Sequence, residues 1–161
     1  MSSHRPSPEG PAWLSAREQT AWRSYLRASE LLMGALDAQL QRDAGVPHTY
    51  YVVLAMLSEA PDRTLRMSEL AGLASASPSR LSHAVGKLEA RGWVTRRPSP
   101  GDGRGTLATL TDAGLAFLVA QAPGHVDAVR RALFDHLSAD QVDQLAAMFA
   151  DVAVGLARGD A

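Results

Sequence analysis

A glycine-rich stretch, SPGDGRGTLATLT at residues 99–111, carries one acid and one arginine near its tip, Asp102 and Arg104. In nucleotide-binding proteins such loops cradle phosphate, because glycine lets backbone N–H groups approach the anion closely. Neither G-x-x-x-x-G-K-S/T nor G-x-G-x-x-G occurs in this chain, however, and no buried parallel strand precedes the loop. A nucleotide site is therefore not predicted, and the arginine needs another explanation.

The sequence also lacks the usual catalytic and metal-binding patterns. It contains no cysteine, which excludes disulfides, thiolate-bound zinc and a cysteine nucleophile. Its five histidines show no H-x-x-x-H spacing, and there is no G-x-S-x-G nucleophile elbow. We therefore expect no metal, no cofactor and no enzymatic activity.

Basic residues are concentrated in the middle of the chain. The net charge of the whole chain is −1, but residues 63–104 hold eight Arg and Lys against three acids, an excess of five positive charges. The ends of the chain are correspondingly acidic. A localised positive region of this kind indicates a polyanionic partner such as DNA.

Two short helices are expected within this basic region. The first is SELAGLAS, which we expect Ser68 to cap. The second begins at Ser77 and Pro78, a strong start signal, and ends at Gly92. Its apolar residues Leu81, Val85 and Leu88 share one face, which leaves a polar and basic face outward. This pattern is a helix-turn-helix.

The runs WVTRR and TLATL, which flank the glycine-rich loop, have the composition of short strands. Together they predict a β-hairpin with the loop at its tip, directly after the basic helix. The expected unit is a winged helix-turn-helix, in which the second helix enters the major groove and Arg104 reaches the minor groove, held by Asp102. The alternative is that Gly and Asp only make turns and that Arg104 is a solvated charge. The predicted DNA-binding residues are Ser77, Ser79, Arg80, Ser82, His83, Lys87, Arg97, Asp102 and Arg104.

Longer helices are expected on both sides of this unit. One runs from the capping box at Ser15 to Gly45, and another from His48 to Pro61. Two more begin at Thr111 and Ser138, and we expect the helix from Thr111 to kink or break at Pro123-Gly124. The first and last helices carry apolar stripes longer than a small winged-helix domain can cover, which favours a dimer over packing within one chain.

The chain resembles the MarR family of bacterial transcriptional regulators over about residues 15–157. The family's wing pattern D-x-R, followed by L-T, is matched by Asp102, Arg104, Leu110 and Thr111, and LRMSELA, KLEARGWVTRRPSPGD and LTDAG occur in the family's order. One departure is His83, where family members often carry arginine. The resemblance implies a homodimer that binds two near-palindromic half-sites of an operator.

Combining residues and resemblance, we expect a mainly α fold with a small β-hairpin wing, built from a winged helix-turn-helix lobe and a helical dimerisation lobe. Residues 47–111 would form the DNA-binding lobe, and residues 15–46 and 112–157 the dimerisation region. Residues 1–14, with three prolines and no apolar segment, are expected to be a disordered lead-in without a signal peptide. No apolar run approaches the roughly 20 residues of a membrane span. The expected location is the cytoplasm.

The resemblance also implies that the first, second and fifth helices meet beside the DNA-binding lobe, where relatives often bind small aromatic or phenolic effectors. The candidate ligand-binding residues are Trp22, Met33, His48, Tyr50, Tyr51 and Phe117. Aromatic residues at helical spacing are also common in a plain core, and that alternative remains open. Our hypothesis is a ligand-responsive, DNA-binding repressor; its rivals are a helical interaction module with an incidental basic patch and an enzyme with an unrecognised site.

Overall fold

The computed structural model describes residues 13–74, 76–100 and 105–158 of the chain. Its elements are α1 (Ala16–Ala44), α2 (His48–Glu59), the 3-10 helix η1 (Pro61–Arg63), β1 (Thr64–Arg66), α3 (Met67–Leu73), α4 (Pro78–Ala90), β2 (Val94–Pro98), β3 (Thr106–Leu110), α5 (Asp112–Ala132), the 3-10 helix η2 (Phe134–His136) and α6 (Ala139–Arg158). The mainly α fold with a winged helix-turn-helix is confirmed. None of the helices in the described ranges has both the length and the apolarity to cross a membrane.

The helix boundaries follow the capping signals of the sequence, with one exception. Ser15 and Glu18 form the expected reciprocal capping box at the start of α1, and Gly45 ends that helix with a positive φ of 64°. The exception is α3, where the prediction that Ser68 is the cap was wrong. The cap is Arg66, whose backbone N–H donates to the Glu69 carboxylate at 3.0 Å, so the helix begins earlier than its serine suggests.

The sheet contains a strand that the sequence did not reveal. Strands β2 and β3 form the predicted antiparallel hairpin, and β1 pairs with the other edge of β3, giving the order β1-β3-β2. The sequence analysis assigns no strand to the segment before α3. With only three residues, β1 is too short to show the alternation that marks a strand, and its pairing with Thr109 and its neighbours is a long-range contact.

The core lies in the winged helix-turn-helix, between α2, α3, α4 and the sheet, and is closed by the end of α1 and the start of α5. Each fully buried leucine or valine there contributes about 1.5–3 kcal/mol relative to the exposed state. The largest fully buried side chains are Leu40, Leu54, Leu57, Leu70, Leu81, Leu88, Val46, Val53, Val85 and Val94. A rigid core therefore supports α4 from behind.

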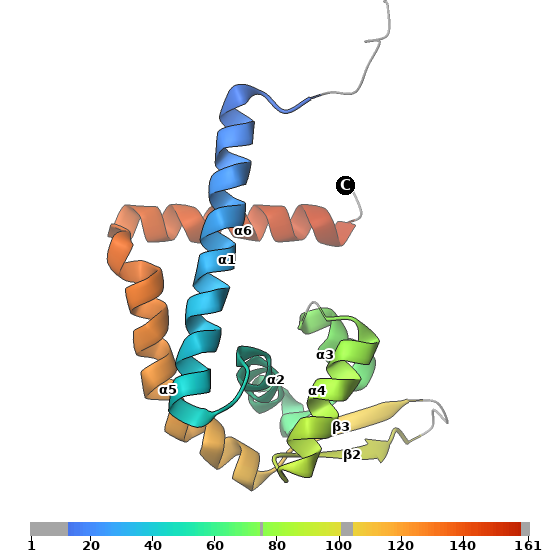
Figure 1. The fold of residues 1–161 in the computed structure, drawn as a ribbon. Helices are drawn as coiled ribbons and strands as arrows, with labels where there is room; N and C mark the ends of the chain where they lie inside the picture. Colours follow the sequence, from blue (N-terminus) through green and yellow to red (C-terminus); the bar gives the residue numbers. More distant parts are fainter. Residues whose placement is uncertain (1–12, 75, 101–104, 159–161) are drawn as a thin grey trace, which may run out of the picture.

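The remaining helices extend away from this core. Figure 1 shows α1 rising from the winged helix-turn-helix, with α6 lying across it and α5 rising beside it. The structure excludes the break we considered at Pro123-Gly124, because α5 continues through Pro123; the helix changes direction about half-way along. No residue of α6 is buried against the rest of the described chain.

Candidate nucleic-acid interface

Helix α4 presents a polar face to solvent and an apolar face to the core. The Ser77 hydroxyl accepts the backbone N–H of Arg80 at 3.3 Å, and Pro78 occupies the first helical position, so the helix start is fixed by its own sequence. Leu81, Ala84, Val85 and Leu88 are buried. The exposed residues include all the predicted contacts on this helix, Ser79, Arg80, Ser82, His83 and Lys87. The helix can therefore enter a groove without uncovering its core.

The wing begins where β2 and β3 separate. Arg97 is exposed on β2, and the Ser99 N–H donates to the Gly105 carbonyl at 2.8 Å, which closes the base of the wing. Asp102 and Arg104 fall in residues 101–104, outside the described part of the chain. Their roles at the wing tip therefore stay a prediction.

An ion pair that the sequence analysis did not single out ties the wing to α4. The Arg96 guanidinium donates to Glu89 Oε2 from Nε at 2.9 Å and from Nη2 at 2.6 Å, and the Arg96 backbone N–H donates to Oε1 at 3.2 Å. The side-chain hydrogen bonds from Arg96 are the main cause that lowers the pKa of Glu89. The two side chains come from different elements, so no local spacing could have identified them.

A hollow of about 310 Å³ lies between α4, the start of α3 and the base of the wing. Its lining combines two arginines with three hydroxyl groups, and consists of Arg66, Met67, Ser68, Ser82, Arg96, Gly105 and Thr106. Guanidinium groups and hydroxyls are the donors that proteins use on phosphate oxygens. This surface therefore suits a DNA backbone that passes between the helix and the wing.

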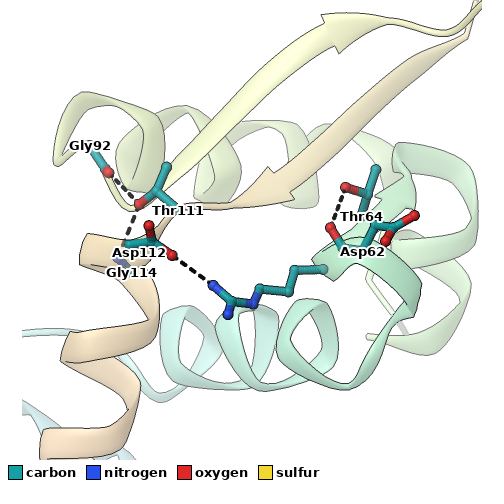
Figure 2. Close-up of polar contacts among 7 residues, drawn as sticks. Asp62, Thr64, Gly92, Thr111, Asp112 and Gly114 are labelled. Carbon is teal, nitrogen blue, oxygen red and sulfur yellow. Dashed lines mark hydrogen bonds and ion pairs between the residues drawn. The ribbon is translucent and has the colours of Figure 1, made fainter.

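The wing is fastened to α5 by a short motif, LTDAG. The Thr111 hydroxyl donates to the Gly92 carbonyl at 2.7 Å and accepts the Gly114 N–H at 3.0 Å, as Figure 2 shows. A side chain at Gly114 would collide with the carbonyl oxygen of Trp93, so the first turn of α5 packs directly against backbone. The start of α5 therefore cannot move without moving the strands of the wing.

A second contact at this anchor comes from the turn before β1. Arg63 Nη1 donates to Asp112 Oδ1 in the first turn of α5 at 2.9 Å, drawn as a dashed line in Figure 2. Asp62 and Arg63 both have positive φ, 51° and 53°, a conformation that costs a non-glycine residue about 1–2 kcal/mol. The Thr64 hydroxyl donates to the Asp62 carbonyl at 3.0 Å and thereby supports the turn. Because the ion pair is exposed, its own contribution to stability is small.

Comparison with known proteins identifies the family. The model of the MarR family matches residues 44–105. The solved structure of Sco3205, a MarR family transcriptional regulator from Streptomyces coelicolor in complex with DNA, is 54% identical, with 92% of each chain covered and a TM-score of 0.84. The structure of AbsC, another MarR family regulator of that organism, is 37% identical, covers 92% of this chain and 99% of AbsC, and has a TM-score of 0.82.

The chain belongs to the MarR family of transcriptional regulators. Among characterised relatives, the transcriptional repressor MprA of Escherichia coli is 30% identical over 101 residues, which make up 63% of this chain and 57% of MprA. The matched region thus spans little more than half of that repressor. The resemblance that the wing motif indicated is confirmed, and the relatives are regulators rather than enzymes.

The residues suggested by the MarR resemblance as an effector site lie in three places. Trp22 stacks on Tyr25 with ring centroids 5.9 Å apart on the exposed part of α1, where Met33 is also exposed. Phe117 stacks on Trp93 at 3.9 Å, and Tyr50 lies 5.9 Å from the guanidinium of Arg91. The structure brings His48 and Tyr51 together with a third residue, His125, which the sequence analysis did not propose as a ligand residue.

Proposed function

We propose that this MarR family protein represses transcription by binding a near-palindromic operator as a homodimer. The observation that carries the proposal is the exposed polar face of α4, which is held by a capped start and a fully buried apolar face. Residues at the start of such a helix contact base edges in the major groove. Sco3205, which matches 92% of this chain, has been solved with DNA. In our assignment Ser77, Ser79, Arg80, Ser82, His83 and Lys87 approach the major groove.

The wing completes this proposed interface. Arg97 on β2 would contact the backbone beside the groove, and Arg104, held by Asp102, would enter the minor groove, whose negative potential attracts guanidinium. The hollow beside Arg96 would accept a phosphate between the two. Contacts to phosphate position the protein, whereas contacts to base edges choose the sequence.

A second copy of this chain is the proposed cover for α1 and α6. Large apolar side chains on both helices are about half exposed or more, among them Trp22, Leu31, Met33, Met148, Phe149, Val152 and Leu156. Residues 16–29 at the start of α1 hold three arginines against one glutamate, and α6 holds three aspartates against one arginine, so this part of α1 and α6 have opposite net charges. An apolar face of this extent is the signature of a protein interface. Residues 15–46 and 112–157 would form the dimerisation region, and residues 47–111 the DNA-binding lobe.

The dimer would place two α4 helices on two half-sites of the operator. A two-fold dimer contacts half-sites about 34–36 Å apart, one turn of the duplex. Any ligand that changes the angle between the two lobes changes this spacing and lowers affinity. We retain a small aromatic or phenolic effector near His48 and Tyr51 as part of the proposal, since these two rings lie at the junction between the lobes.

The proposal is tested by selecting fragments of genomic DNA on the purified full-length chain and measuring their affinity at several salt concentrations. We expect a shared near-palindromic site and a steep loss of affinity as salt increases, because each neutralised phosphate releases counterions. Arg80→Ala should weaken binding, whereas Arg42→Ala, a matched change at an exposed arginine in the last turn of α1, should leave it unchanged. Weak binding with no sequence preference would favour the interaction module with an incidental basic patch.

A further inference from the structure

A group of polar and aromatic side chains joins α1, α2 and α5 where the two lobes meet. We call it the junction cluster. It consists of Asp37, Gln39 and Asp43 from α1, His48 and Tyr51 from α2, and His125 from α5. Gln39 is almost fully buried, with 3% of its surface exposed. The cluster is therefore part of the packing between the lobes.

The hydrogen bonds of the cluster determine which ring nitrogen of the neutral His125 carries the hydrogen. Gln39 Nε2 donates to Asp43 Oδ2 at 2.8 Å, so the amide oxygen of Gln39 faces the other way. This oxygen lies 3.3 Å from His125 Nδ1. Because an amide oxygen only accepts, Nδ1 must carry the hydrogen. A second proton on this imidazole would have to bind at Nε2.

The two histidine rings lie against each other and against Tyr51. The ring centroid of His125 is 4.3 Å from that of Tyr51 and 5.3 Å from that of His48. Burial is the main cause that lowers the pKa of both histidines, and repulsion from His48 lowers the pKa of His125 further. The Asp37 carboxylate, which accepts the His48 backbone N–H at 2.8 Å, opposes this effect on His48. The packed junction thus favours neutral imidazoles.

We propose that the junction cluster is a proton-responsive switch, in which protonation of His48 and His125 separates α5 from α1 and α2 and releases the operator. Two like charges on adjacent half-buried rings destabilise the packed arrangement. Protonation of the imidazoles therefore favours any arrangement of the helices in which both rings are exposed to water. This inference rests on the proposed function and names a way in which that function is regulated.

The position of the cluster gives the switch its connection to DNA. Helix α5 starts at the Thr111 anchor of the wing, and α2 packs against α4 inside the DNA-binding core. Both helices meet α1, which belongs to the proposed dimerisation region. A change in packing here therefore changes the angle between the lobes and the separation of the two α4 helices, to which binding of two fixed half-sites is sensitive.

The direction of the pH effect follows from the lowered pKa values. The packed junction binds fewer protons than the open one below the ordinary histidine pKa of about 6.5, so acid favours the open form. His83 on α4 belongs to the proposed DNA interface, so it would act on binding directly and not through the junction. The experiment therefore uses the His83→Gln protein as its reference, which leaves the junction as the expected source of acid sensitivity.

The test measures the affinity of the full-length His83→Gln dimer for a duplex carrying the selected genomic site, by fluorescence anisotropy at constant ionic strength. Between about pH 7.5 and 5.5 we expect affinity to fall at least about fivefold, the lower end of typical couplings between sites. Adding His125→Gln or His48→Gln should remove most of this fall. Adding His136→Gln, a change at an exposed histidine on η2, should preserve it. Circular dichroism at each pH checks that the proteins remain folded.

The possible results separate this inference from the proposed function. Sequence-specific binding at pH 7.5 that is unchanged at pH 5.5 would overturn the switch alone, and so would a full acid response in the folded His125→Gln protein. Absence of specific binding at every pH in the protein that retains His83 would overturn the proposed function. If the junction variants do not fold, NMR titration of the histidine C2–H signals in the His83→Gln protein decides the matter. Two histidines should titrate below about pH 6.5 together with a shift of the Tyr51 ring, and unchanged Tyr51 signals would contradict the proposal.

Discussion

Gly114→Ala tests how firmly α5 is joined to the wing. The added Cβ would collide with the Trp93 carbonyl oxygen and with Cδ1 of Leu110. One of these atoms belongs to the backbone, so a rotamer change cannot relieve the collision. The first turn of α5 would have to shift, which weakens the 3.0 Å hydrogen bond from the Gly114 N–H to Thr111.

The magnitude follows from three contributions. Overpacking of a close contact costs about 1–3 kcal/mol. Loss of the Thr111 cap lowers the free energy of unfolding by about 1 kcal/mol, and replacing glycine by alanine within a helix raises it by about 1 kcal/mol. The last two cancel, so we expect the free energy of unfolding to fall by about 1–3 kcal/mol, as measured by chemical denaturation at one fixed protein concentration.

The matched control is Gly72→Ala in α3, where an added Cβ meets no atom within 4 Å. This substitution should be neutral or stabilise the protein by up to about 1 kcal/mol. Operator affinity of the folded Gly114→Ala protein should fall as well, because α5 carries the wing. If Gly114→Ala were as stable as Gly72→Ala and bound DNA normally, the close packing of α5 on Trp93 would be refuted.

Further predictions concern the wing, the dimer and the effect of pH on stability. Arg104→Ala should weaken operator binding by about 1–3 kcal/mol, and Asp102→Ala should act in the same direction; unchanged affinity in both would remove the wing tip from the interface. Val152→Asp, which places a charge on the exposed apolar face of α6, should give monomers in size-exclusion chromatography with light scattering; a stable dimer would exclude this face from the interface. The lowered pKa values of His48 and His125 should make thermal stability decrease as pH falls below about 6.5, and a His48→Gln/His125→Gln protein should lose less stability over that range; equal losses would contradict the burial of these rings.

Local signals predicted the elements that carry the interface. The Ser77-Pro78 start and the apolar spacing of α4 gave both its position and its exposed face, because these signals act within one turn. The wing strands likewise coincide with WVTRR and TLATL to within one residue at each end. The continuous α5 could not be predicted in the same way, because the cost of a proline within a helix is offset by packing against neighbours that lie far away in the sequence.

Contacts between residues that lie far apart in the sequence could not be predicted either. The Glu89–Arg96 pair bridges the end of α4 and β2, and the contact of His125 with Gln39 joins residues 86 positions apart. Neither pair forms a motif, and one histidine in an amphipathic helix gives no sign of its partner. The charge excess in residues 63–104 indicated a DNA surface. It could not show that Arg96 forms an ion pair with Glu89, whereas the neighbouring Arg97 is exposed on β2.

Hydroxyl-radical footprinting of the selected site tests whether two copies of α4 contact one operator. We expect two protected regions that are related by the near-palindrome, with centres about one helical turn, 10–10.5 base pairs, apart. Arg80→Ala should weaken protection in both regions together, because each subunit supplies the same helix. Protection of a single region, or protection that does not depend on sequence, would contradict the claim.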